Sequence, residues 1–179
     1  VEFWPESVNS IKKLQSVGFK IYNQNPLLKG VNDNFKTLSK LYSLLRDNDI
    51  ENHYLFHAVP LRGMSHHRTS VEKGLELISA LSSCGEFSGR TKPKYCILSD
   101  IGKIILYHDT IIKRDKTTNS ILLKSGFKIE DRLRWNPSWK KPDTVELDKN
   151  GFMQVWYLDG EEENLNLRAE EKATHSSIQ

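Results

Sequence analysis

Two segments of the sequence place residue types that could do chemistry at the ends of predicted strands. The first is a short apolar run, residues 19–22, that leads directly into the amides of Asn23 and Gln24. The second is a later run that ends at Asp100 and is followed, after a glycine, by Lys103. Because the loops at the carboxyl ends of strands form the open face of an α/β fold, polar side chains there are candidates for ligand contacts. A lysine in this setting could act as an amine nucleophile.

Each of these residues also has a simpler interpretation. Lys103 could be a solvated lysine of a turn, and Asp100 could stabilise the same turn through its side chain. Asn23 and Gln24 could satisfy backbone groups where a strand ends. The residue types alone leave both interpretations open.

Composition sets modest limits on the function. The 179 residues include 26 basic and 23 acidic side chains, a formal net charge of +3 that is too mild to indicate a nucleic-acid partner. The length fits about one to one and a half domains. Cys84 and Cys96 could form at most one bridge, and they suggest no disulfide framework. Without a membrane span or a signal peptide, the sequence predicts a cytoplasmic protein.

Strand and helix patterns alternate over the first hundred residues. Helices are predicted after caps at Ser7, Asp33 and Thr69 or Ser70. Strands are predicted at residues 1–4, 19–21, 53–59 and 95–98. This alternation favours a parallel sheet built by right-handed crossovers. Since a barrel needs about eight strands, the segment is either a small open sheet or the second half of a larger barrel, and the strand pattern at residues 1–4 suggests truncation.

After Lys103 the pattern changes to short β-type runs separated by polar turns, which predicts a β-rich extension over residues 104–160. Bases mix there with Trp135 and Trp139, as in surfaces that stack on nucleic acid. Because the net charge is nearly neutral, we expect the tryptophans to pack against the preceding domain instead. Residues 161–179 are polar and predict a disordered tail.

Histidines and an arginine form a further group. His66 and His67, with His57 nearby, suggest a metal site, but no cysteine or carboxylate stands at ligand spacing. We therefore predict a turn with surface histidines and no metal. Arg68 could anchor an anion or the start of a helix, and the sequence does not separate these roles.

Three blocks resemble, in order and at about the right spacing, segments of the lysine 2,3-aminomutase family of radical S-adenosylmethionine enzymes. The blocks are residues 22–33, residues 63–74, and residues 88–93 leading to Asp100 and Lys103. The resemblance covers roughly residues 1–107. It implies that residues 1–103 are the C-terminal part of a TIM-type β/α barrel, followed by the β-rich extension.

The resemblance also implies a radical rearrangement. In that family an iron–sulfur cluster cleaves S-adenosylmethionine, and the resulting radical acts on an amino acid held as an imine on pyridoxal phosphate, so that nitrogen migrates between neighbouring carbons. Lys103 matches the pyridoxal lysine, Asp100 matches an acid that contacts the substrate, and Asn23 and Gln24 fall in a block that lines the cofactor site. An amine that forms an imine must be neutral, so we expect Lys103 to be partly buried.

Departures from the family pattern refine the expectation. Val59 stands where a second substrate acid of the lysine enzymes should fall, so lysine is not favoured as the substrate. The three-cysteine motif C-x-x-x-C-x-x-C is absent, and Cys84 and Cys96 are too few to hold a [4Fe-4S] cluster. The cluster and S-adenosylmethionine would then belong to a missing N-terminal barrel half, without which the chain is inactive.

The expected partners are therefore that missing half and an amino-acid substrate, with neither nucleic acid nor membrane. A homo-oligomer stays open. The alternative function is a non-catalytic α/β module or remnant that binds an anion, a nucleotide or a partner protein through the same strand ends.

Overall fold

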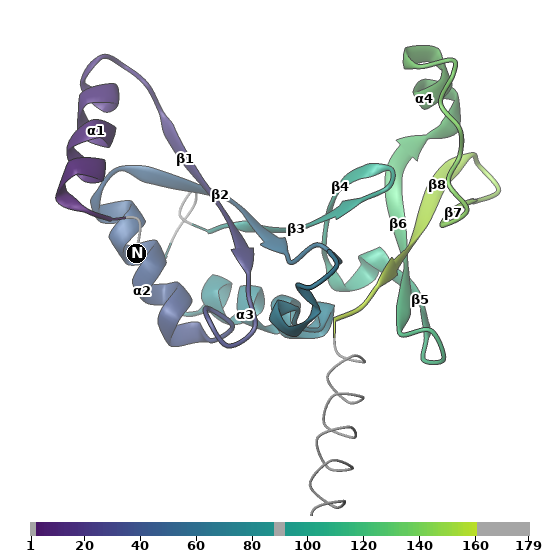
Figure 1. The fold of residues 1–179 in the computed structure, drawn as a ribbon, viewed down its shortest axis with the longest axis horizontal. Helices are drawn as coiled ribbons and strands as arrows, with labels where there is room; N and C mark the ends of the chain where they lie inside the picture. Colours follow the sequence, from purple (N-terminus) through teal and green to yellow (C-terminus); the bar gives the residue numbers. More distant parts are fainter. Residues whose placement is uncertain (1–2, 88–91, 161–179) are drawn as a thin grey trace, which may run out of the picture.

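Strand and helix alternate along the first part of the chain, as predicted. The structure is a computed structural model that describes residues 3–87 and 92–160 (Figure 1). Of the strand predicted at residues 1–4, the structure describes residues 3 and 4. These two residues precede the first helix and pair with no strand. The elements in order are α1 (Pro5–Ser16), β1 (Ile21–Leu27), α2 (Phe35–Asp47), β2 (Ile50–His57), the 3-10 turn η1 (Ser65–His67), α3 (Val71–Ser83), β3 (Lys94–Ser99) and β4 (Gly102–Ile105).

The four strands form one sheet in the order β1-β2-β3-β4. The pairs β1–β2 and β2–β3 are parallel as predicted, but β4 returns antiparallel to β3. The turn between β3 and β4 is too short for the crossover that a parallel strand requires. Gly102, the first residue of β4, has a φ of +123°, which glycine adopts readily. The predicted domain boundary at residue 103 therefore falls inside β4. The helices α2 and α3 cover one face of this sheet (Figure 1).

The strand β1 is longer than predicted, so the amides of Asn23 and Gln24 lie in its middle and not at its end. Pairing with β2 continues to Leu27 through a register shift between these two residues. Pro26 is compatible with the strand because β1 lies at the edge of the sheet, where a proline need not interrupt the ladder. Backbone pairing thus outweighs the polar composition that suggested a strand end.

The helices begin at or near their predicted caps. Ser70 caps α3 as predicted, with its side chain accepting a hydrogen bond of 3.2 Å from a backbone amide of the first turn. The helix α2 is capped by Asn34 and not by its neighbour Asp33. The helix α1 begins at Pro5, ahead of the predicted cap Ser7, because proline is well suited to the first helical position. No helix within the described ranges is both long and apolar enough to cross a membrane.

The residues after β4 build a second sheet, which is antiparallel throughout and has the order β5-β6-β8-β7. Its strands correspond to the β-type runs predicted after Lys103. The tail predicted to be disordered, residues 161–179, lies outside the described residues. The elements are the 3-10 turn η3 (His108–Thr110), β5 (Ile111–Asp115), β6 (Ser120–Lys128), α4 (Ile129–Trp135), β7 (Val145–Leu147) and β8 (Phe152–Leu158).

The two tryptophans of the extension separate, so the prediction that both pack inward is wrong for one of them. Trp139 is partly buried against the core, and the guanidinium of Arg132 lies 5.5 Å from its ring centroid. Trp135 ends α4 and is 87% exposed. The short helix α4 buries no residue of its own, and Trp135 at its end stays on the surface with it.

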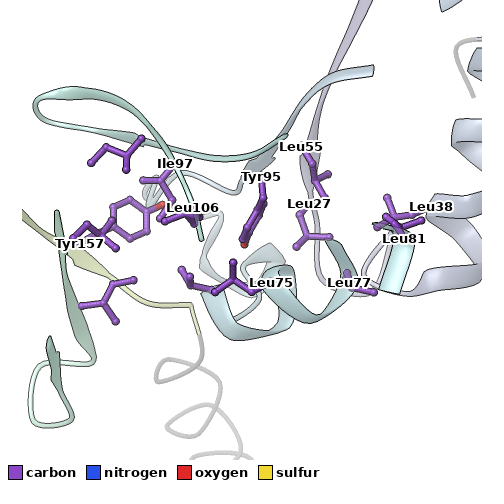
Figure 2. Close-up of a cluster of buried hydrophobic side chains, with 14 of the residues drawn as sticks. Leu27, Leu38, Leu55, Leu75, Leu77, Leu81, Tyr95, Ile97, Leu106 and Tyr157 are labelled. Carbon is purple, nitrogen blue, oxygen red and sulfur yellow. The ribbon is translucent and has the colours of Figure 1, made fainter. Parts of the chain in front are cut away.

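One cluster of buried apolar side chains joins the two sheets (Figure 2). Leu27 and Leu55 come from β1 and β2, Leu75 from α3 and Tyr95 from β3, while Tyr157 comes from β8 of the second sheet. Full burial of one such large apolar side chain contributes about 1.5–3 kcal/mol. Because both sheets contribute to the cluster, the C-terminal sheet shares its core with the first sheet.

Candidate functional site

The face of the first sheet that is opposite to the helices collects side chains from all four strands. Strand register places Gln24 of β1 beside Tyr54 of β2, and Lys103 of β4 beside Leu98 of β3. Phe56 lies on the same face because it follows Tyr54 by two residues in the strand. This open face therefore carries the amide of Gln24, the rings of Tyr54 and Phe56 and the amine of Lys103.

Lys103 extends its amine over the aromatic pair of β2. The Nζ atom lies 5.0 Å from the ring centroid of Tyr54 and 5.4 Å from that of Phe56. A cation at this distance is attracted to the negative face of each ring. The partial burial predicted for Lys103 is wrong, because the residue is exposed on the edge strand β4 and no part of the described chain covers it.

Asn23 and Gln24, predicted to act together, point to opposite faces of β1. The Nδ2 atom of Asn23 donates to Asn25 Oδ1 at 2.7 Å and to Asn52 Oδ1 at 3.3 Å, on the helix-covered side where Asn52 is buried. Gln24 is exposed on the other side. The structure thus brings Gln24 to the face that carries Lys103, whereas Asn23 is satisfied within the sheet.

Asp100 lies in the turn between β3 and β4, and its carboxylate contacts the C-terminal segment. Its Oδ2 atom accepts a hydrogen bond of 2.5 Å from Thr144 Oγ1. The same turn is held by Ser99, whose hydroxyl donates to the carbonyl oxygen of Gly102 at 2.8 Å. The carboxylate of Asp100 thus contacts the C-terminal segment, while Ser99 supplies the side-chain hydrogen bond within the turn.

A pocket of about 310 Å³ opens beside Lys103, where the two sheets meet. Lys103 and Ile105 of β4 form one wall, and Lys124 and Phe127 of β6 form the other. The structure therefore adds a second amine to the surroundings of Lys103.

Sequence reasoning missed several of these residues, and for two of them a signal was present. Tyr54 and Phe56 stand two positions apart inside a predicted strand, which places both on one face. Lys124 carried no such signal, because it reaches the site from the other sheet.

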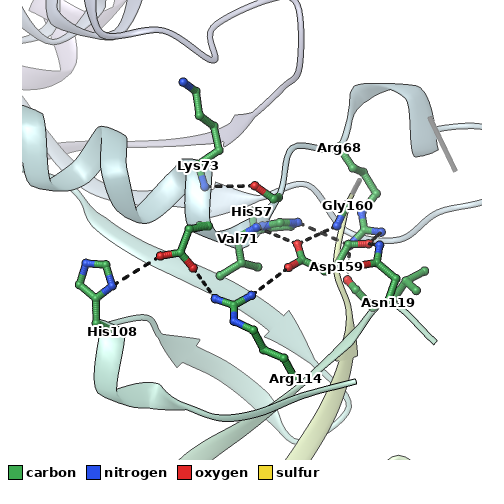
Figure 3. Close-up of polar contacts among 12 residues, drawn as sticks. His57, Arg68, Val71, Lys73, His108, Arg114, Asn119, Asp159 and Gly160 are labelled. Carbon is green, nitrogen blue, oxygen red and sulfur yellow. Dashed lines mark hydrogen bonds and ion pairs between the residues drawn. The ribbon is translucent and has the colours of Figure 1, made fainter. Parts of the chain in front are cut away.

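A buried polar cluster of Arg68, Asp159 and His57, which we call the joint, lies between the second sheet and the first (Figure 3). Arg68 is only 2% exposed, and it donates to the carbonyl oxygens of Ala58 at 2.9 Å, Leu158 at 2.6 Å and Asp159 at 3.4 Å. Its guanidinium carbon also lies 5.6 Å from the ring centroid of Tyr157. Backbone carbonyls thus occupy the donors of Arg68, so its role is to fasten β8 to the end of β2 and not to hold a free anion.

Asp159 extends this joint to the start of α3. Its Oδ1 atom accepts a hydrogen bond of 2.8 Å from the amide of Val71, and its Oδ2 atom lies 3.6 Å from Arg114 Nη1. Arg114 also pairs with Glu72, which lies 3.9 Å from the Nδ1 atom of His108. A carboxylate at the first amides of a helix is favoured both by hydrogen bonding and by the helix dipole.

His57 completes the joint as a neutral, buried histidine. Its Nδ1 atom lies 2.8 Å from Tyr95 Oη, and its Nε2 atom lies 3.5 Å from Arg68 Nη2. Burial, followed by the charge of Arg68, lowers the pKa of His57 to about 3. Because a guanidinium only donates, we infer that Nε2 accepts and that Nδ1 carries the proton.

Residues 3–87 and 92–160 contain no group of three or more His, Cys, Asp or Glu side chains that could hold a metal ion. Cys84 and Cys96 are both free, and burial raises the pKa of the Cys96 thiol to about 11. The rings of His66 and His67 contact each other in a tilted arrangement, with centroids 4.0 Å apart and an interplanar angle of 45°. The residues that the structure describes do not fit an iron–sulfur cluster.

The chain is similar to several 2,3-aminomutases. It is 38% identical over 97 residues to the L-lysine 2,3-aminomutase of Methanococcus maripaludis, which is 54% of this chain and 22% of that protein. A provisionally named L-lysine 2,3-aminomutase of Aquifex aeolicus is 36% identical over 109 residues, 59% of this chain and 28% of that protein. The glutamate 2,3-aminomutase of Clostridioides difficile is 31% identical over 97 residues, 54% of this chain and 22% of that protein.

The matches are limited in extent. The chain spans about a quarter of the length of these relatives. No protein-family model matches the chain.

Proposed function

We propose that this chain, whose resemblance to lysine 2,3-aminomutases is confirmed over about half its length, is the C-terminal portion of a pyridoxal-phosphate-dependent amino-acid 2,3-aminomutase. The observation that carries the proposal is the amine of Lys103 above Tyr54 and Phe56, on an open sheet face that also presents Gln24. The reaction would be the migration of an amino group between neighbouring carbons of an amino acid.

The form of the first sheet supports a place in a larger barrel. Parallel strands with helices on one face are the repeating unit of a β/α barrel, and the other face would then line its interior. The edge strand β1 is free to pair with a further strand. We propose that residues up to about 103 are this barrel portion and that residues 104–160 form an extension fastened to it by Arg68.

The residues of the open face suit pyridoxal phosphate. When bound, this cofactor supplies an aldehyde that captures amines and a ring that withdraws electrons from the captured group. Lys103 would hold the aldehyde carbon, and Tyr54 and Phe56 offer apolar rings on which a pyridine ring can stack. Gln24 can donate and accept hydrogen bonds at the edge of such a ring.

The cluster and S-adenosylmethionine would be held by another part of the protein. Cys84 and Cys96 cannot supply three thiolates, so we propose that the chain is inactive without a partner segment that carries them. That segment would also cover Lys103, which is exposed in the described part of the chain. Because the relatives are named for lysine and for glutamate, similarity leaves the substrate class open.

Covalent trapping tests the proposal. The chain, alone and together with the segment that carries the three-cysteine motif, is incubated with limiting pyridoxal phosphate, reduced with borohydride and mapped by peptide mass. We expect a reduced adduct on Lys103, and its loss in Lys103→Ala. Lys94→Ala is the matched control, because Lys94 is an exposed lysine on the same face, in register with Tyr54.

Three results would contradict the proposal. The first is label spread evenly over surface lysines, and the second is an undiminished adduct in Lys103→Ala. The third, the absence of any Lys103 adduct when the cysteine segment is present, would favour a non-catalytic module.

A further inference from the structure

We propose that Lys124 of the C-terminal sheet is a specificity-determining residue, which binds the side-chain carboxylate of an acidic amino acid held at Lys103. This inference rests on the proposed function and deepens it by naming the substrate class. It also gives the extension a direct part in ligand binding, beyond its place in the core.

Lys103 and Lys124 belong to different sheets but line the same pocket. Lys103 and Lys124 both line the volume of about 310 Å³ between β4 and β6, a size at the lower end of small-molecule sites. Ile105 and Phe127 supply apolar wall between them, as the methylene groups of an amino-acid side chain require. An amino acid that reacts at Lys103 could thus extend its side chain toward Lys124.

Lys124 lines the pocket and forms only a weak ion pair with a neighbouring carboxylate. Its Nζ atom lies 2.7 Å from Asp109 Oδ2, and the two side chains are 50% and 75% exposed. An ion pair this exposed is weak, because water and salt screen both charges. The ammonium has three donor hydrogens, so it can retain Asp109 and still donate to a ligand carboxylate.

The charges around the pocket favour an acidic ligand over a basic one. Its lining residues include two lysines and no carboxylate within the described part of the chain. Asp100, the residue predicted to hold a substrate, is hydrogen-bonded to Thr144. Val59 offers no charge at all. A ligand ammonium would meet like charges on two lysines, while the carboxylate of Asp109 is already paired with Lys124. A ligand carboxylate would meet an opposite charge at Lys124 and would share it with Asp109.

Ligand titration followed by NMR tests the inference without any cofactor. The amide signals of residues 124–127 are followed in the isotope-labelled chain as glutarate, pentane-1,5-diamine or inorganic phosphate is added. Glutarate and the diamine have the same carbon length and opposite charges. We expect a saturable shift with glutarate, a binding constant about fivefold weaker in Lys124→Gln, and retained binding in Lys124→Arg.

The neighbouring lysine supplies the control. Lys128→Gln removes a charge from the same strand, but Lys128 does not line this pocket and its amine lies over Phe152, at 5.1 Å from the ring centroid. Glutarate affinity should be unchanged in this variant. The dispersion of the amide signals verifies that each variant is folded.

Each other outcome overturns the inference. Tighter binding of the diamine than of glutarate would indicate a basic ligand, and equal glutarate affinity in Lys124→Gln would remove Lys124 from the site. Phosphate binding tighter than glutarate would assign the pocket to a phosphate group and not to a substrate carboxylate. The Lys103 adduct is measured separately, so its absence beside intact glutarate binding would refute the proposed function alone.

Discussion

Arg68 and Lys103 each place a cation near an aromatic ring, but in opposite surroundings. The guanidinium of Arg68 is buried beside Tyr157, and three backbone carbonyls accept its hydrogen bonds. The ammonium of Lys103 lies over Tyr54 on an open sheet face, and it forms no ion pair with a described residue. Both residues belong to segments with the same family resemblance.

The difference indicates how the two residues are used. A buried cation whose donors are directed at backbone carbonyls and a buried histidine stabilises the fold, and its removal leaves unsatisfied acceptors. An exposed amine that has few fixed partners contributes little to stability and remains free to react. Arg68 therefore stabilises the fold, whereas the exposed amine of Lys103 is available for the ligand role that we propose for it.

The largest effect should follow from Arg68→Ala. This change leaves the carbonyl of Leu158 without the donor it has in Arg68. It leaves the carbonyl of Ala58 with only the longer 3.4 Å hydrogen bond from Tyr157 Oη, and it opens a cavity beside Tyr157. We expect the free energy of unfolding in urea to fall by about 3–5 kcal/mol. Arg134→Ala is the control, because the Arg134 side chain is 74% exposed and its loss should leave stability nearly unchanged. If both variants lost the same free energy of unfolding, Arg68 would contribute no more to stability than an exposed surface arginine.

A somewhat smaller loss is expected from Gly74→Ala in α3. A Cβ atom at this position would lie 2.0 Å from ring atoms of Tyr95, the partner of His57 in the joint. Tyr95 or the helix must shift to relieve this overlap, so the free energy of unfolding should fall by about 1–3 kcal/mol. The same substitution in an exposed helix usually stabilises the protein. Gly126→Ala is the control, since its added carbon meets no atom within 4 Å. A stabilised Gly74→Ala variant, measured by thermal unfolding, would show that the contact with Tyr95 is loose.

The joint should also make stability depend on pH. His57 has a pKa of about 3 in the folded chain against an ordinary value of 6.5, so below pH 6.5 the unfolded chain takes up a proton that the folded chain does not. Stability should therefore fall as the pH falls from 6.5 toward 3, by up to about 1.4 kcal/mol per pH unit. Urea unfolding at pH 6 and pH 5 measures this slope before most carboxylates titrate. His57→Gln should flatten it, and an unchanged slope would exclude His57 as its source.

The smallest effect on stability should come from the open face. Lys103→Gln removes only an exposed cation–aromatic contact, so the free energy of unfolding should change by about 0.5 kcal/mol or less. The same variant should lose the pyridoxal adduct. A loss of stability as large as that of Arg68→Ala would mean that Lys103 is a structural residue.

Local sequence patterns were sufficient for part of the fold. The helix from residue 71 and the strand around residues 95–98 follow from a Ser70 cap and from apolar periodicity, because caps and periodicity act within a few residues. The direction of β4 and the full length of β1 were not predicted. Both depend on pairing with a neighbouring strand, which polar residues such as Asn23 and Gln24 do not reveal.

The candidate site was predicted unevenly for the same reason. Lys103 and Gln24 were identified from their positions near strand ends, and they do lie on one face. Asn23 differs from Gln24 by a single position, yet in a strand that difference turns its side chain to the opposite face.

The sequence by itself determined the alternation of strands and helices, the Ser70 cap and the resemblance to aminomutases, since these depend on neighbouring residues and on short motifs. Only the tertiary structure decided that Arg68 fastens the second sheet and that Lys124 shares a pocket with Lys103. These contacts join residues far apart in the chain, and their partners include backbone carbonyls, which every residue carries and no sequence pattern distinguishes.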